Sequence, residues 1–233
     1  MKQITFQSVF DTPTVKLGKL NEIGITPDGR EWEYLYATEA ITKHMVVSNP
    51  ANTTVATVSS SQNEASENVF ITEAAAGWTV GAYEDHWVAV NTGTGTGQVA
   101  KIKGNTTTTL ELYTDFALAT ALAVADSGIA IRHYTDAEKS PVTTLLTPLK
   151  GVAQVSFASG DYGWFLKRGI GGVLGGAAMT INTLISPGDD TEGTAITIPV
   201  AAGDEFGEYS VVGRVLVANS AADIAALVDV NIR

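Results

Sequence analysis

The residues of this chain that could carry out chemistry are few and scattered. None of the 233 residues is a cysteine, which excludes disulfides, thiol catalysis, zinc ribbons and iron–sulfur clusters. A nucleophilic serine needs a base and a sharp turn such as Gly-x-Ser-x-Gly, and the sequence has no such motif. Carboxylate pairs that would suit glycoside cleavage occur in any acidic protein, and no single pair stands out here. We therefore expect that the protein is not an enzyme.

Two short segments offer metal ligands. Residues 84–86 (Glu-Asp-His) combine an imidazole with two carboxylates, but His44 and His133 are distant in sequence and no matching cluster accompanies them. Asp189-Asp190 with Glu192 could bind calcium in a loop, although the spacing is not that of an EF-hand. We interpret the first segment as a histidine on a strand surface and the second as a solvated turn. No metal or other cofactor is expected.

Two glycine-rich segments have the look of phosphate-binding loops. Residues 93–97 (Gly-Thr-Gly-Thr-Gly) are followed by the alternating pattern of residues 98–103, which indicates a strand and not the helix that would hold a pyrophosphate. Residues 169–176 (GIGGVLGG) lack the Lys-Ser or Lys-Thr that completes a P-loop. We expect a hairpin loop in the first case. In the second we expect tight turns or close backbone packing between subunits.

The charge of the chain limits its partners. The net charge is −11, with 14 basic residues scattered among 25 acidic ones, so the clustered cations that bind a phosphate backbone are missing and nucleic acid is not expected as a partner. No apolar run approaches the roughly 18 residues of a membrane helix. The first residues, Met-Lys-Gln-Ile-Thr-Phe, lack the apolar region of a signal peptide. We expect a protein made in the cytoplasm that has no membrane partner.

The elements that position these residues are predicted to be β-strands, because the apolar residues alternate with period two. Helical patterns are short: residues 115–122 and 220–224 are each predicted to form one or two turns. The fold class is therefore all-β, a sandwich or barrel-like domain with a second β module and short helical turns only. Alternation marks strands near residues 23–25, 86–90, 98–103, 110–112, 129–131, 153–157, 196–200, 211–217 and 228–232.

Composition divides the chain into three segments. Residues 1–48 are rich in charged and aromatic side chains, residues 49–138 in Thr, Ser, Asn and Ala, and the rest in glycine and apolar residues. We predict one β domain built from residues 1–48 and 139–233, with residues 49–138 as an inserted β module. Residues 1–19 are predicted to form an N-terminal arm with no core of its own, which lies on a partner.

Aromatic residues give the best candidates for a binding surface. Two sets alternate along predicted strands, and one of them follows an arginine. Core packing explains such rings, but Trp, Tyr and Arg also anchor protein–protein contacts, so both interpretations stay open. The predicted interface consists of Phe6, Phe10, Arg30, Trp32, Tyr34, Tyr162 and Trp164.

Several of these segments, taken in order, resemble the decoration (cement) proteins of tailed-bacteriophage heads. The likeness spans most of the chain, and the order of the motifs carries it more than any single motif. The motifs are Leu17-Gly18 with Asp28-Gly29-Arg30, residues 93–97 with residues 102–105, Gly151-Val152-Ala153-Gln154 with Tyr162-Gly163-Trp164, Gly213-Arg214-Val215, and residues 227–232.

The resemblance implies a structural protein without catalytic activity. Such a protein binds the major capsid protein on the outer surface of the virion and bridges neighbouring capsomers, commonly as a homotrimer. An acidic protein also suits the outside of a shell better than the inside, where packaged DNA would repel it. The alternatives are another virion protein, such as a head fibre, tail or adaptor subunit, or a glycan-binding β protein.

Overall fold

The computed structural model describes residues 1–64, 67–124, 127–141, 148–188, 191–198 and 210–232. The chain forms two compact units, which are described separately: unit 1 consists of Met1–Pro50 with Thr135–Arg233, and unit 2 of Ala51–Tyr134. The boundaries expected after residues 48 and 138 lie two and four residues from these. Residues 135–138 therefore belong to unit 1 and not to the inserted module.

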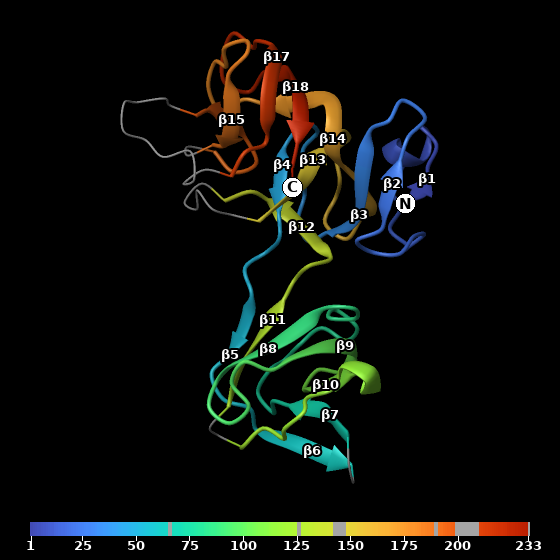
Figure 1. The fold of residues 1–233 in the computed structure, drawn as a ribbon, viewed down its shortest axis with the longest axis vertical. Helices are drawn as coiled ribbons and strands as arrows, with labels where there is room; N and C mark the ends of the chain where they lie inside the picture. Colours follow the sequence, from blue (N-terminus) through green and yellow to red (C-terminus); the bar gives the residue numbers. More distant parts are fainter. Residues whose placement is uncertain (65–66, 125–126, 142–147, 189–190, 199–209, 233) are drawn as a thin grey trace. The chain divides into compact units, whose positions relative to one another are not determined.

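The prediction of an all-β fold is confirmed. The described residues form strands β1 to β18 and only two short 3-10 turns (Figure 1). Unit 1 holds one sheet, whose strands follow each other in this order: β1 (Lys2–Gln3), β2 (Ile23–Ile25), β3 (Glu31–Ala37), β12 (Asp136–Lys139), β4 (Val46–Ser48), β13 (Leu149–Ala153), β14 (Tyr162–Leu174), β18 (Ala225–Asn231), β17 (Gly213–Val217), β15 (Leu184–Pro187) and β16 (Ala195–Thr197).

Part of this sheet closes into a ring of five strands. Strand β3 pairs with β12 on one edge and with β14 on the other, and β4 and β13 complete the circuit. Side chains alternate across each strand, so one set fills the ring and the other packs outside it. The inner set is a buried cluster from all five strands and the adjoining loops: Leu35, Ala37, Ile41, Val47, Ala137, Ala153, Phe157 and Phe165.

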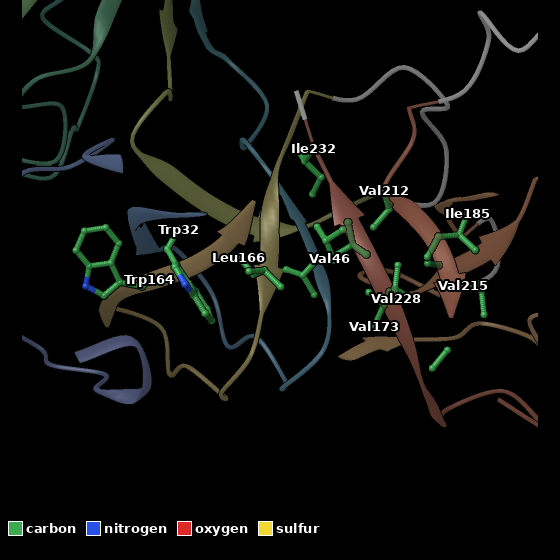
Figure 2. Close-up of a cluster of buried hydrophobic side chains, with 14 of the residues drawn as sticks. Trp32, Val46, Trp164, Leu166, Val173, Ile185, Val212, Val215, Val228 and Ile232 are labelled. Atoms are coloured by element: carbon green, nitrogen blue, oxygen red, sulfur yellow. The ribbon is translucent and has the colours of Figure 1, made fainter. Parts of the chain in front are cut away.

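A second buried cluster packs on the other side of the same strands and continues along β14 into β17 and β18. Trp32, Val152 and Leu166 contribute from the ring strands. Val215 and Val228 are paired across β17 and β18 and face the same cluster. Figure 2 shows Trp32, Leu166, Val215 and Val228 of this cluster, spread along the sheet. Strand β3 is therefore covered on both faces, which explains its nearly continuous run of buried residues.

The N-terminal arm packs onto unit 1. Among the described residues it has no buried cluster of its own, as expected, and its buried side chains join the second cluster of unit 1. Strand β1 runs parallel to β2. Ile4 and Val9 are buried in the second cluster of unit 1, which we call the outer cluster. Val9 belongs to the 3-10 turn η1 (Ser8–Phe10). The carbonyl of Pro13 accepts a hydrogen bond of 2.8 Å from the Tyr162 N–H. Ile4 and Val9 anchor the arm, because their burial in this cluster removes apolar surface from water.

Unit 2 is one curled antiparallel sheet of seven strands around its own buried cluster. Val88, Ile102, Leu110 and Ile129 face this cluster with the alternation that the sequence shows. The strands at the two ends of the sheet are β5 and β6. The order across the sheet is β5 (Thr53–Val55), β11 (Gly128–Arg132), β8 (Trp87–Thr92), β9 (Val99–Asn105), β10 (Thr109–Leu112), β7 (Glu67–Thr72) and β6 (Ser60–Glu64).

Both helical predictions are wrong in extent. Only the 3-10 turn η2 (Thr114–Phe116) forms where residues 115–122 were expected to be helical, and Ala117 has an extended backbone. Leu118 and Leu122 are both buried in the core of unit 2, so their packing overrides the local helix propensity. At residues 220–224 the chain makes a turn in which Asp223 has a φ of 59°.

The two glycine-rich segments have different roles. Gly93, Gly95 and Gly97 all have positive φ in the loop between β8 and β9, as expected for a hairpin loop. Residues 169–174 lie inside the long strand β14, where tight turns had been one expectation. Gly169 has a φ of 109°, and a Cβ added there would lie 2.5 Å from Arg30 Cγ. Close packing was expected between subunits, and here it is found within one chain, between Gly169 and Arg30.

Replacing Gly169 with alanine is expected to lower the free energy of unfolding by about 3 kcal/mol, because it combines a strained backbone with a clash against Arg30. Gly29→Ala is a matched control, since its φ is 85° but nothing lies within 4 Å of the added Cβ. We expect it to cost only about 1 kcal/mol. Urea unfolding of both variants measures the difference, and equal losses would contradict a steric role for Arg30.

Candidate protein-interaction surface

The Thr26–Arg30 turn joins β2 to β3 and positions the arginine of the predicted interface. The Thr26 N–H donates to the Arg30 carbonyl at 3.0 Å, and the Thr26 hydroxyl donates to Asp28 Oδ1 at 2.6 Å. Gly29 has a φ of 85°, which suits a residue without Cβ. Arg30 Nε donates to Asp28 Oδ2 at 2.7 Å. The motif is thus a rigid hairpin turn that fixes a half-buried guanidinium.

Arg30 lies between a surface ring and a core ring. Its guanidinium carbon is 5.7 Å from the centroid of the Phe6 ring and 5.3 Å from that of Trp32. Both distances suit cation–π attraction. The Trp32 Nε1–H donates to the Thr26 hydroxyl at 3.2 Å, so the same turn also satisfies the buried indole. Arg30 therefore connects the arm to the hairpin.

Three of the seven predicted interface residues are core residues, so this part of the prediction is wrong. Trp32 is fully buried, and Tyr34 and Trp164 are nearly so. The Tyr34 and Trp164 rings pack on each other at 5.1 Å, and the arm lies over them. Burial raises the pKa of the Tyr34 hydroxyl, which accepts a hydrogen bond of 3.2 Å from the Leu17 N–H. Tyr34 and Trp164 line a hollow of about 290 Å³ together with residues of the arm, but little of either side chain is exposed.

The other four predicted residues lie at or near the surface. Tyr162 is half-buried, and its ring packs on Tyr36 at 4.9 Å. Arg30 is partly exposed beside Phe6. Phe6 and Phe10 are 42% and 50% exposed. The structure thus separates the predicted set into three buried aromatic residues and four at or near the surface, of which Phe6 and Phe10 lie on the arm.

The exposed apolar residues of the arm form what we call the arm surface: Phe6, Phe10, Val15 and Leu17. Val15 and Leu17 are 67% and 73% exposed and were not predicted. Residues 1–19 also carry three lysines against one aspartate, in a chain whose net charge is −11. The local charge of the arm was the signal that could have drawn attention to these two residues. Exposed apolar side chains on a basic segment suit contact with an acidic protein surface.

A second group of exposed apolar side chains lies on β14, β17 and β18, on the face opposite the outer cluster. Leu227 and Val217 are paired across β18 and β17, and Ile170 lies on β14 opposite Asp229. All three apolar side chains are exposed because their neighbours along each strand face the core. Arg214 is the other partner of Asp229 in this row. We call this group the sheet surface.

The buried Glu33 carboxylate of unit 1 is paired and belongs to the framework of the fold. The Glu33 side chain is 5% exposed and lies between two lysines. Lys150 Nζ is 3.0 Å from Glu33 Oε1, and Lys167 Nζ is 2.9 Å from Oε2. A buried carboxylate with two cations is satisfied internally, so it contributes no reactive group.

The Glu138 carboxyl, on β12, is sensitive to pH. Burial raises its pKa from 4.5 to about 7, and the negative charges of Glu39, Glu192 and Asp136 add to this effect. Lys139 bridges two of these carboxylates, with its Nζ 3.1 Å from Glu39 and 3.6 Å from Glu192. Glu138 therefore lies near three other carboxylates, and a single lysine contacts two of them.

Unit 1 is expected to lose stability as the pH rises from 4.5 to about 7, because folded Glu138 holds its proton in a range where the unfolded chain releases it. Glu138→Gln stays neutral and should remove this part of the pH dependence. Thermal unfolding of both proteins across this range measures it. Parallel profiles would show that the carboxyl is ionised in the folded state at the lower end of the range.

His86 does not match the interpretation as a histidine on a strand surface. His86 is buried in unit 2, with its ring 5.1 Å from that of His133 and 6.0 Å from Tyr83. His86 Nδ1 lies 3.1 Å from the Glu84 carbonyl. His44 has a φ of 73°, and burial lowers its pKa. Asp189 and Asp190 of the predicted loop lie outside the described residues.

Two further findings bear on the site. No helix among the described residues is long and apolar enough to cross a membrane. No protein-family model, curated protein or solved structure matches the chain.

Proposed function

We propose that this chain is a structural protein of a tailed-phage virion, which binds the major capsid protein on the outer capsid surface and bridges neighbouring capsomers. The arm surface is the observation that carries the proposal. It places exposed rings and aliphatic side chains on a segment that is more basic than the acidic remainder of the chain. Buried Ile4 and Val9 anchor that segment to unit 1, so the exposed side chains are presented on a fixed backbone.

The motifs that resemble decoration proteins support the same proposal from a different direction. The Thr26–Arg30 turn holds Arg30 against Phe6, which belongs to the arm surface. The sheet surface then serves self-association, and we propose a homotrimer. This assignment gives the protein no catalytic role and no cofactor, and places it on the virion after synthesis in the host cytoplasm.

The direct test mixes the purified chain with undecorated phage heads. We expect co-sedimentation that saturates, and cryo-EM density at regular positions on the outer head lattice. Light scattering of the free protein should give three times the mass of the 24.4 kDa chain. In cryo-EM of the intact virion, density on the tail or on a single vertex would favour a tail, fibre or adaptor subunit. A monomer that ignores heads would overturn the proposal.

A further inference from the structure

Unit 2 carries a hollow that the proposed capsid contact does not use. It lies between strand β5 with the residues that follow it and the segment Glu73–Thr79 that follows β7, and Tyr83 completes its wall. Its volume is about 600 Å³, within the range of sites that bind small ligands. All the residues that line it belong to unit 2.

The polar groups of the hollow are hydroxyls and one carboxylate. Thr54, Thr57 and Thr79 are exposed and line it. Each hydroxyl both donates and accepts hydrogen bonds, which matches the hydroxyl groups of a sugar. The Glu73 carboxylate is held in place, because Oε2 accepts from the Ser59 hydroxyl at 3.0 Å and Oε1 from the Ala75 N–H at 3.1 Å. An oriented carboxylate is a strong acceptor for sugar hydroxyls.

The aromatic wall of the hollow is also held in place. The half-buried Tyr83 ring makes edge contacts with Trp78 at 5.9 Å, His133 at 5.6 Å and His86 at 6.0 Å. The Tyr83 N–H donates to Asn105 Oδ1 at 2.9 Å, which fixes the backbone as well. A rigid ring beside polar groups provides an apolar surface for the C–H groups of a sugar at little entropic cost.

The charge of the hollow narrows the class of ligand. Among the described residues that line it, none is lysine or arginine, while Glu73 is negative. Phosphate, sulfate and acidic sugars are therefore disfavoured. An extended peptide pairing with the end strand β5 is the competing occupant. However, β5 has only three residues, and the hollow has a ring and a carboxylate that backbone pairing would not need.

We propose that this hollow is a binding site for a neutral carbohydrate, recognised by the threonine hydroxyls and Glu73 and stacked against Tyr83. The site adds a second binding activity in unit 2, and it stands whether or not unit 1 binds a capsid. Affinity in the millimolar range is expected for a single disaccharide in an open site.

The test titrates lactose, cellobiose and N,N′-diacetylchitobiose into the ¹⁵N-labelled full chain and follows amide chemical shifts. At least one of these sugars should cause saturable shifts at residues 53–57 and 73–83. Sialyllactose and a neutral threonine-rich peptide serve as probes of the disfavoured classes. Saturation by the peptide alone would replace the sugar with a peptide, and absence of binding by all three neutral sugars would overturn the proposal.

Variants separate recognition from folding. Thr54→Val/Thr57→Val removes two exposed hydroxyls at almost constant shape, and Glu73→Gln keeps groups that can bond with Ser59 and the Ala75 N–H. Each is expected to weaken sugar binding about tenfold. Thr107→Val, at an exposed site in unit 2 outside the hollow, should bind like the wild type. Unchanged affinity in both hollow variants would exclude this site.

Discussion

Replacement of both Phe6 and Phe10 by serine is expected to abolish measurable binding to undecorated heads. The two rings are about half exposed in the free chain, so a partner would bury the remaining area. At about 1.5 kcal/mol for each ring, the loss is about 3 kcal/mol, or more than a hundredfold in Kd. A head-binding isotherm, measured by co-sedimentation at a series of protein concentrations, reports this change.

A matched variant tests whether the loss is specific to the arm surface. Val80→Ser/Val99→Ser removes two exposed apolar side chains from unit 2 and should leave the isotherm unchanged. Both double variants are expected to unfold close to the wild-type temperature, because the replaced side chains are exposed. If the phenylalanine variant bound heads with wild-type affinity, the arm surface would not be the capsid contact.

Deletion of residues 1–15 would be a less direct test of the arm surface than these point substitutions. The deletion would remove Ile4 and Val9 from the outer cluster and uncover Tyr34 and Trp164. Exposure of these side chains is expected to destabilise unit 1. Loss of head binding would then have two explanations, so point substitutions on the exposed side of the arm are the better experiment.

The sequence predicted the strands well, because period-two alternation depends on side chains that face a core. It could not assign the aromatic residues of β3 to a surface or to the interior. Trp32 and Tyr34 share one face of the strand, but alternation does not reveal whether that face is covered. Coverage depends on the arm and on the closure of the ring through β14, both of which are long-range contacts.

The motifs behind the resemblance turn out to have structural roles in this chain. The Gln154 amide forms two hydrogen bonds with Gly172, in which its Nε2 donates to the carbonyl at 3.0 Å and its Oε1 accepts from the N–H at 3.0 Å. Gly151 lies where a Cβ would be 2.8 Å from Phe165 Cβ. These structural roles account for the motifs through the fold alone, so the motifs do not identify the partner.

The candidate sites depend on packing that local sequence does not encode. Strands β6 and β7 and a long loop separate Thr54 and Thr57 from Tyr83 along the chain. Only the curled sheet brings these residues to one hollow. Leu118 and Leu122 gave a helical pattern because apolar spacing in a short segment fits several structures. The core of unit 2 selects a non-helical one.

Asn219→Asp is expected to lower the free energy of unfolding of unit 1 by about 4 kcal/mol. Asn219 is nearly fully buried, and its Nδ2 donates to three carbonyls, those of Ala177, Ala221 and Ile224, at 2.8 to 3.0 Å. Its Oδ1 accepts from the Met179 N–H at 2.5 Å. A carboxylate retains only the last of these bonds and faces the three carbonyl oxygens without a proton to donate. Urea unfolding measures the loss.

The pH dependence of this loss identifies its cause. A buried aspartate that faces carbonyl oxygens has a raised pKa, so protonation should restore one donor and recover part of the stability at about pH 5 compared with about pH 8. Asn182→Asp is the matched control: Asn182 is exposed with a φ of 65°, and its side chain should tolerate the change within about 0.5 kcal/mol. Faster hydrogen exchange confined to β14, β17 and β18 would locate the damage to the turn that Asn219 holds. An Asn219→Asp variant as stable as the wild type at both pH values would mean that the three carbonyls find other donors.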